Sequence, residues 1–121
     1  MHKLNDLQVW VKSRKVAKEI YLLTGKLPNE EKFGLTSQMR RAAVSIASNI
    51  AEGAGRNSDK EFIQFLAIAF GSSYELKTQL FICIDLNFLD EESANEIITA
   101  LEEIEKMIWG LQQSIQKRLK A

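Results

Sequence analysis

Residues that interrupt helices are scarce in this sequence. Its 121 residues include one proline, Pro28, and six glycines. No segment alternates apolar and polar residues between turn residues, as a half-buried strand would. These absences argue against a β-rich fold and favour an all-α protein.

Cysteines, long apolar runs and targeting signals are also missing or nearly so. The one cysteine, Cys83, has no partner for an internal disulfide, which fits a reducing cytoplasm. No apolar run approaches the roughly 18 residues of a membrane-spanning helix, and residues 1–10 do not resemble a secretory signal. We therefore expect a cytoplasmic protein with no membrane partner, folded as a single domain over residues 1–121.

The residue types that carry catalysis are equally rare. The only histidine, His2, lies near the chain end without partner residues, and Cys83 falls on an apolar helical stripe with no histidine to activate it. The Glu-x-x-His pairs of di-iron bundles do not occur. We predict no catalytic residues, no metal, no cofactor and no small-molecule substrate, and hence a protein that is not an enzyme.

Apolar residues recur at helical spacing in four segments. The predicted helices cover residues 6–24, 36–53, 59–85 and 91–120. Short turns join the last three, so these neighbours should be antiparallel, and we predict an up-down-up-down four-helix bundle. In the loop after the first helix, Leu27, Phe33 and Leu35 are expected to fold back over one end of the bundle.

Helix ends carry recognisable signals. Asn5 or Asp6 is the predicted N-cap of the first helix, and Asp90 that of the fourth. An S-x-x-E capping box begins at Ser58 and marks the start of the third helix. Gly53, Gly55 and Asn57 are expected to terminate the second.

The third helix is apolar on two sides. One stripe contains Phe62, Phe65, Leu66, Ala69, Ser73, Leu76, Leu80 and Cys83. A second contains Ile63, Ala67, Phe70, Tyr74 and Phe81. A helix in a monomeric bundle needs only one apolar stripe, so we predict a homo-oligomer whose subunit interface includes Ile63, Phe70, Tyr74 and Phe81. Periodicity leaves open which stripe faces the core.

Polar residues interrupt both central helices. One interpretation makes Arg41, Asn49, Glu52 and Glu75 a structural network, in which Arg41 pairs with Glu52 or Glu75 and fixes helix register or a subunit contact. The other makes Arg40, Arg41 and Arg56 contacts to phosphates. The structural role is favoured for Arg41 and Glu75, and both readings stay open for Arg40 and Arg56.

Charge is balanced overall but uneven along the chain. Residues 1–60 carry 11 Lys/Arg and 6 Asp/Glu, whereas residues 61–121 carry 5 and 10. This asymmetry permits a basic face for nucleic acid or a head-to-tail assembly of copies, although the surfaces of bundles are commonly mixed. The candidate nucleic-acid contacts are Lys12, Arg14, Lys15, Lys18, Arg40, Arg41 and Arg56.

Three phrases together resemble one family: LQVWVKS, FGLTSQMRRAAVSIASNIAEGAGR and SDKEFIQFLAIAFGSSYELKTQL. They are similar to the bacterial four-helix-bundle proteins encoded in intervening sequences of 23S ribosomal RNA, which are sometimes labelled ribosomal-protein-like. The resemblance implies a ring-shaped homopentamer. It extends to the accessory proteins of diversity-generating retroelements, which bind nucleic acid and a reverse transcriptase through a basic surface.

We predict a non-enzymatic oligomeric scaffold that binds RNA or a nucleic-acid-handling protein. The alternative is a protein-interaction module whose basic helix contacts an acidic protein without nucleic acid. Binding that weakens steeply with salt favours the first, and capture of a protein partner after nuclease treatment favours the second.

Overall fold

The computed structural model describes residues 3–120, which form helices without a strand. Four α-helices account for most of them: α1 (Gln8–Thr24), α2 (Leu35–Ala54), α3 (Asp59–Asp85) and α4 (Glu91–Lys120). Two single-turn 3-10 helices, η1 (Leu4–Asp6) and η2 (Asn29–Glu31), precede α1 and α2. The all-α prediction is confirmed for this part of the chain.

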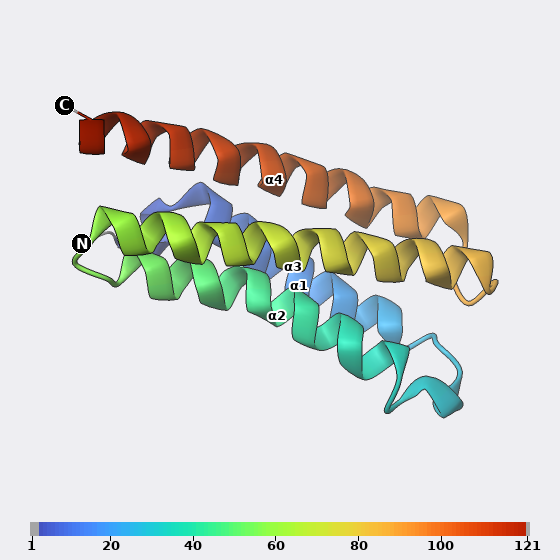
Figure 1. The fold of residues 1–121 in the computed structure, drawn as a ribbon. Helices are drawn as coiled ribbons and strands as arrows, with labels where there is room; N and C mark the ends of the chain where they lie inside the picture. The colour runs from blue at the N-terminus through green and yellow to red at the C-terminus, as the bar shows by residue number, and fades with distance from the viewer. Residues whose placement is uncertain (1–2, 121) are drawn as a thin grey trace.

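Each helix packs against two others around a common core. The principal contacts join α1 to α2, α2 to α3, α3 to α4 and α4 to α1. Figure 1 shows α3 between α2 and α4, with α1 behind. Followed by colour from the N-terminus, α1 and α3 cross the picture from left to right, and α2 and α4 return from right to left.

The structure decides which stripe of α3 faces the core. Residues of the first stripe, except the half-buried Phe65, are buried, among them Leu66, Ala69 and Leu76. In the second stripe, Tyr74 and Phe81 remain 53% and 50% exposed. The first stripe is therefore the core stripe, and the second lies at its border, with Ile63 and Phe70 packed in part against the core and Tyr74 and Phe81 facing outward in a single chain.

The small residues of α2 allow a close approach to α3. Ala43 is fully buried, and a Cβ added to Gly53 would lie 2.7 Å from Cβ of Phe65 and 2.8 Å from Cδ1 of Phe62. α2 ends at Ala54 with Gly55 as its C-cap, so the predicted termination is confirmed for Gly55 but is wrong for Gly53, which lies inside the helix. Packing, and not helix termination, explains the missing side chain.

Two predicted caps are confirmed. The Ser58 hydroxyl accepts the Glu61 backbone N–H at 3.2 Å, and Asp90 Oδ2 accepts the Ser93 N–H at 3.0 Å. These bonds satisfy N–H groups that a helix leaves unpaired at its start.

The predicted caps of α1 are wrong. Asn5 and Asp6 belong to η1, and α1 begins two residues later with Leu7 as its N-cap, which makes no side-chain cap bond. Leu4 and Leu7 both pack against the core. Burial of these two leucines therefore sets the entry of the chain into α1, in place of a polar cap.

The loop that precedes α2 covers the bundle end only in part. Leu27 is buried and Leu35 packs against the core, as predicted, but Phe33 is 90% exposed. The Gly34 N–H donates to the Glu31 carbonyl at 2.9 Å. Together with the η2 turn, this hydrogen bond directs residue 33 outward. The prediction that Phe33 folds back over the bundle is therefore wrong.

Candidate functional site

Three of the predicted basic residues form a row of exposed cations on the outer face of α1. Arg14, Lys15 and Lys18 are exposed on the face opposite the buried Val16 and Ile20, because their spacing of three and four residues keeps them together. Within residues 3–120 none of the three forms an ion pair. We call Arg14, Lys15 and Lys18 the α1 basic stripe.

Trp10 adds an aromatic surface beside this stripe. The Arg14 guanidinium lies 4.9 Å from the centroid of the Trp10 ring, within cation–π range. Trp10 is half-buried, since it also packs against the core. The contact holds Arg14 over the ring and leaves its N–H groups available on the surface.

Lys12 is engaged elsewhere. Its ammonium donates to the Glu103 carboxylate on α4 and forms an ion pair with it. That hydrogen bond, together with the Lys12 charge, lowers the pKa of Glu103. Lys12 therefore ties α1 to α4 and is not part of the stripe.

Arg40 closes the end of α1. Its Nε donates to the Thr24 hydroxyl at 2.9 Å, and Nη2 donates to the Tyr21 carbonyl at 3.2 Å. The guanidinium also lies 4.5 Å from the Tyr21 ring centroid. These contacts satisfy a carbonyl at the helix end and suit a cation at its negative pole.

Arg56 sits in the turn between α2 and α3. Its Nη1 lies 3.7 Å from Oε1 of Glu61, and its guanidinium lies 5.0 Å from the Phe65 ring centroid. Both charged side chains are about half exposed, so the ion pair contributes little to stability.

The predicted network around Arg41 is absent from a single chain. Arg41, Glu52 and Glu75 are all exposed, and within residues 3–120 no ion pair or hydrogen bond joins Arg41 to either glutamate. Arg41 and Glu75 border one shallow hollow of about 360 Å³ without contact. Within one chain the pairing does not form, because both helices turn these residues toward the surface; a pairing across a subunit contact stays a prediction.

Serine hydroxyls, in place of the charged side chains predicted from the sequence, form a polar contact between α2 and α3. The Asn49 amide donates to the Ser45 carbonyl at 2.8 Å and to its hydroxyl at 2.9 Å. The Ser45 hydroxyl in turn shares a hydrogen bond with the Ser72 hydroxyl of α3, with 2.9 Å between the oxygens. Asn49 is therefore structural, as predicted, but with neutral partners.

A hollow opens between the end of α1 and the start of α2. Its volume is about 580 Å³, and the loop before α2 contributes Phe33 to its wall. We call it the α1–α2 hollow, lined by Tyr21, Lys32, Phe33, Thr36, Ser37, Arg40, Arg41, Val44 and Ser45. Its charged lining residues are all cations.

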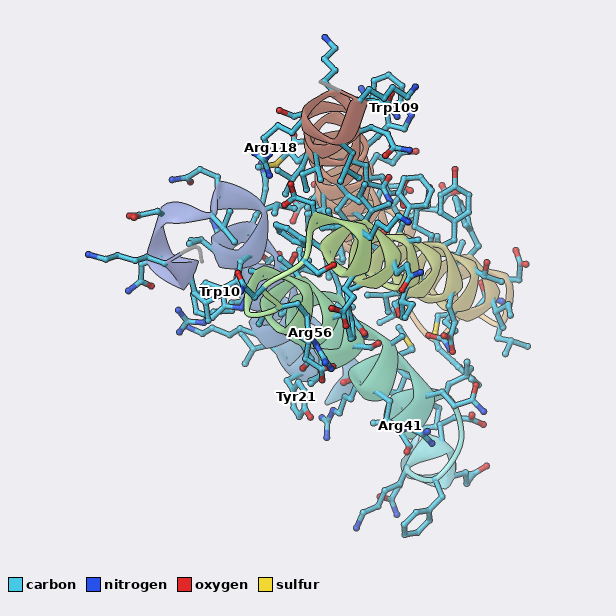
Figure 2. The ribbon with its side chains drawn as sticks, turned by 60° about the vertical axis from the view of Figure 1, so that its left-hand side comes forward. Trp10, Tyr21, Arg41, Arg56, Trp109 and Arg118 are labelled. Atoms are coloured by element: carbon cyan, nitrogen blue, oxygen red, sulfur yellow. The ribbon has the colours of Figure 1, made fainter. Side chains whose placement is uncertain are left out.

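A second, aromatic depression lies between α3 and α4. The rings of Phe70 and Tyr74 stack with centroids 5.2 Å apart, and Trp109 on α4 is 60% exposed. We call this space of about 470 Å³ the α3–α4 groove, lined by Phe70, Tyr74, Lys77, Glu102, Glu105, Lys106 and Trp109. Figure 2 shows Trp109 on the outside of α4, on the opposite side of that helix from Arg118.

A buried polar cluster that the sequence patterns did not predict forms the floor of this groove. Glu105 accepts the Ser73 hydroxyl at 2.7 Å through Oε2 and pairs with the Lys77 ammonium at 2.9 Å through Oε1. The Lys77 and Glu105 side chains are only 14% and 9% exposed. A signal existed, because Ser73 is the polar member of the core stripe and Glu105 follows the buried Ile104.

The remaining reactive groups are closed off. The Cys83 thiol is buried and points at the Met39 sulfur 3.6 Å away, and burial raises its pKa. A thiol of this kind is a poor nucleophile at neutral pH. Residues 3–120 hold no group of three or more His, Cys, Asp or Glu that could bind a metal ion; His2 lies outside them. No helix in the same range is long and apolar enough to span a membrane.

Comparisons with known proteins agree on one family. The 23S rRNA-intervening sequence protein model matches residues 5–110. Among solved structures, a Bacteroides thetaiotaomicron protein of unknown function from the S23 ribosomal protein family superimposes with a TM-score of 0.80 at 30% sequence identity. The match covers 86% of this chain and 97% of that one. No curated protein matches the sequence.

Proposed function

Because this chain belongs to the 23S rRNA-intervening sequence protein family, as its resemblance predicted, we propose that it is a non-enzymatic, homo-oligomeric scaffold that binds RNA. In this proposal each chain folds as an antiparallel up-down-up-down bundle, and copies of the bundle form a ring in the cytoplasm. Five copies are the number that the family resemblance implies.

The α1 basic stripe is the observation that carries RNA binding. Its three exposed cations have no carboxylate partner within residues 3–120, so phosphates can bind them without breaking an ion pair. Other predicted contacts are already engaged, Lys12 by Glu103 and Arg40 by the end of α1. Trp10 beside Arg14 offers a stacking surface for an unpaired base.

The α3–α4 face supports the oligomer. Ile63 and Phe70 are half-buried against the core, while Tyr74 and Phe81 remain about half exposed in a single chain. Exposed aromatic side chains of this size commonly mark contacts with another protein. Assembly would also repeat the α1 basic stripe once per copy, so weak phosphate contacts would act together.

The test reverses two charges of the stripe. Lys15→Glu with Lys18→Glu should weaken binding of a labelled RNA hairpin by about tenfold or more, and should reduce the slope of log affinity against log salt by roughly one unit per lost contact. Fluorescence anisotropy over a salt series measures both quantities.

Lys60→Glu with Lys117→Glu is the matched control. Both lysines are exposed and without ion pairs within residues 3–120, so the net charge changes equally while the stripe is preserved. Equal loss of affinity in the two double variants would contradict the stripe. RNA binding whose affinity does not change with salt would contradict phosphate recognition. Capture of an acidic protein partner that persists after nuclease treatment, with no binding of RNA, would establish the alternative protein-interaction module.

A further inference from the structure

The α1–α2 hollow combines positive charge with exposed aromatic rings. Within residues 3–120 its lining holds the cations Lys32, Arg40 and Arg41 and no carboxylate. Phe33 is 90% exposed and Tyr21 is 47% exposed, so both rings offer flat apolar surface to a ligand. The volume of about 580 Å³ falls in the range of roughly 300–1,000 Å³ that is usual for small-ligand pockets. This lining suits an anion that also carries a flat ring.

The start of α2 adds backbone donors to the hollow. The Glu31 carboxylate accepts the Leu35 N–H at 3.2 Å, and Glu31 does not line the hollow. The next two N–H groups, those of Thr36 and Ser37, have no hydrogen-bond partner within residues 3–120. Free N–H groups and the helix dipole both favour an anion at this end of α2.

The Thr36 side chain is a separate indication of a ligand. Thr36 is only 8% exposed and lines the hollow, but its hydroxyl has no hydrogen-bond partner in the part of the chain that the structure describes. The buried Thr24, by contrast, donates its hydroxyl to the Ile20 carbonyl at 2.7 Å. An unpaired polar group at a nearly buried position costs free energy. An anionic oxygen in the hollow supplies the acceptor that Thr36 lacks.

A terminal phosphate matches these groups better than a carboxylate or an internal phosphodiester. At neutral pH a phosphate monoester carries about −1.5 to −2 charges and has three strong acceptor oxygens. Lys32 and Arg41 form no ion pair within residues 3–120, so both are available to this charge. Arg40 is held by the Thr24 hydroxyl and the Tyr21 carbonyl, and it adds a fixed positive charge.

The hollow also continues the α1 basic stripe. Lys18 and Tyr21 are three residues apart, so the stripe and the hollow share one face of α1. Figure 2 shows Trp10, Tyr21 and Arg41 on the α1–α2 side of the bundle, away from α4. An RNA strand that follows the stripe toward the end of α1 therefore reaches the hollow.

We propose that the α1–α2 hollow binds a nucleotide that bears a terminal phosphate. The phosphate contacts Thr36 and Arg41, and the base stacks on Phe33. The nucleotide is free or forms the end of an RNA strand, and continuity with the stripe favours the strand end. In that form the inference rests on the proposed RNA binding and names the part of the RNA that the hollow takes.

The test compares RNA ends and free nucleotides on the full chain. Three copies of one internally labelled single-stranded RNA carry a 5′-phosphate, a 3′-phosphate or hydroxyls at both ends. Fluorescence anisotropy should show that a phosphate at one end raises affinity by about tenfold or more. In parallel calorimetric titrations, AMP should bind about tenfold more tightly than adenosine or inorganic phosphate.

Variants locate the gain in the hollow. Thr36→Val keeps the size of a buried side chain and removes its hydroxyl, and Phe33→Ala removes an exposed ring. Each should remove most of the gain from the terminal phosphate and most of the binding of AMP. If Thr36→Val loses its helical circular dichroism, Arg41→Ala, at an exposed position, replaces it. Leu22→Ala is the matched control, since Leu22 is 66% exposed but does not line the hollow, and it should keep the gain.

The outcomes separate this inference from the proposed scaffold. Equal affinity for all three RNAs, with AMP no tighter than inorganic phosphate, would overturn the hollow while RNA binding by the stripe stands. A gain that persists in Thr36→Val and Arg41→Ala would also overturn it, because the phosphate would then bind elsewhere. Binding of AMP that depends on Thr36, with no binding of RNA, would support a free nucleotide and remove the proposed RNA scaffold.

Discussion

α3 uses two different kinds of contact with its neighbours. Against α2 it packs small residues, with Gly53 allowing Phe62 and Phe65 to approach closely. Against α4 it places the buried Lys77–Glu105 pair, bordered by half-exposed aromatic side chains. The first contact is complete within one chain, whereas the second leaves apolar surface uncovered. This uncovered surface is where we propose that a neighbouring copy packs.

The largest expected effect is at the buried pair. Lys77→Met leaves the Glu105 carboxylate without its cation and should lower the free energy of unfolding by about 3 kcal/mol. Lys77→Met combined with Glu105→Leu should recover most of that loss, because no buried charge remains. Urea denaturation at one fixed chain concentration measures both variants. A single-variant loss below about 1 kcal/mol would place the pair among ordinary surface ion pairs.

The next effect tests the close α2–α3 contact. Gly53→Ala places a methyl group against Phe62 and Phe65 and should lower the free energy of unfolding by about 1–3 kcal/mol. Gly110→Ala is the control, since a Cβ there meets nothing within 4 Å. It should raise stability by about 0.5–1 kcal/mol through helix propensity. Thermal unfolding of the two variants with the same sign would contradict the packing role of Gly53.

A smaller effect is expected at the turn between α2 and α3. Ser58→Ala removes the acceptor of the Glu61 N–H and should cost about 1 kcal/mol. Ser58→Asp, which keeps an acceptor at the same place, should restore most of the lost stability. Denaturation curves that fail to separate alanine from aspartate would show that the cap contributes nothing.

The smallest effect concerns pH at the turn between α3 and α4. The Ser93 backbone N–H, and then its hydroxyl, hold the pKa of Asp90 below the usual 3.8. The folded state therefore favours the carboxylate, and this stabilisation is present above pH 3.8 and lost as the pH falls through the lowered pKa. Asp90→Asn keeps an acceptor without titrating, so its stability should fall less on acidification than that of the wild type. An equal fall in the free energy of unfolding of both proteins on acidification would refute the role of Asp90.

Sequence patterns predict the parts of this protein that depend on local chemistry. The helical stripes locate all four α-helices, and side-chain caps at Ser58 and Asp90 mark two of their starts. The burial of Cys83 follows from its place on an apolar stripe. Each of these features depends on residues within one or two helical turns of one another.

The wrong predictions concern features that depend on residues far apart in the sequence. Phe33 is as apolar as Leu27, but the η2 turn directs it to the surface. From the sequence alone, Glu52 and Glu75 are plausible partners of Arg41. In a single chain, α2 and α3 turn these three side chains toward the surface. The Glu105 cluster was missed because its partners are 28 and 32 residues away on another helix. Periodicity on one helix carries no information about which neighbour its residues meet.

The mass of the wild-type particle tests the central claim most directly. Static light scattering at micromolar concentration should give a multiple of the 13.8 kDa chain mass, near five chains if the family resemblance holds. A particle of 13.8 kDa, with Tyr74, Phe81 and Trp109 still open to solvent, would contradict the claim that a neighbouring copy completes the α3–α4 side.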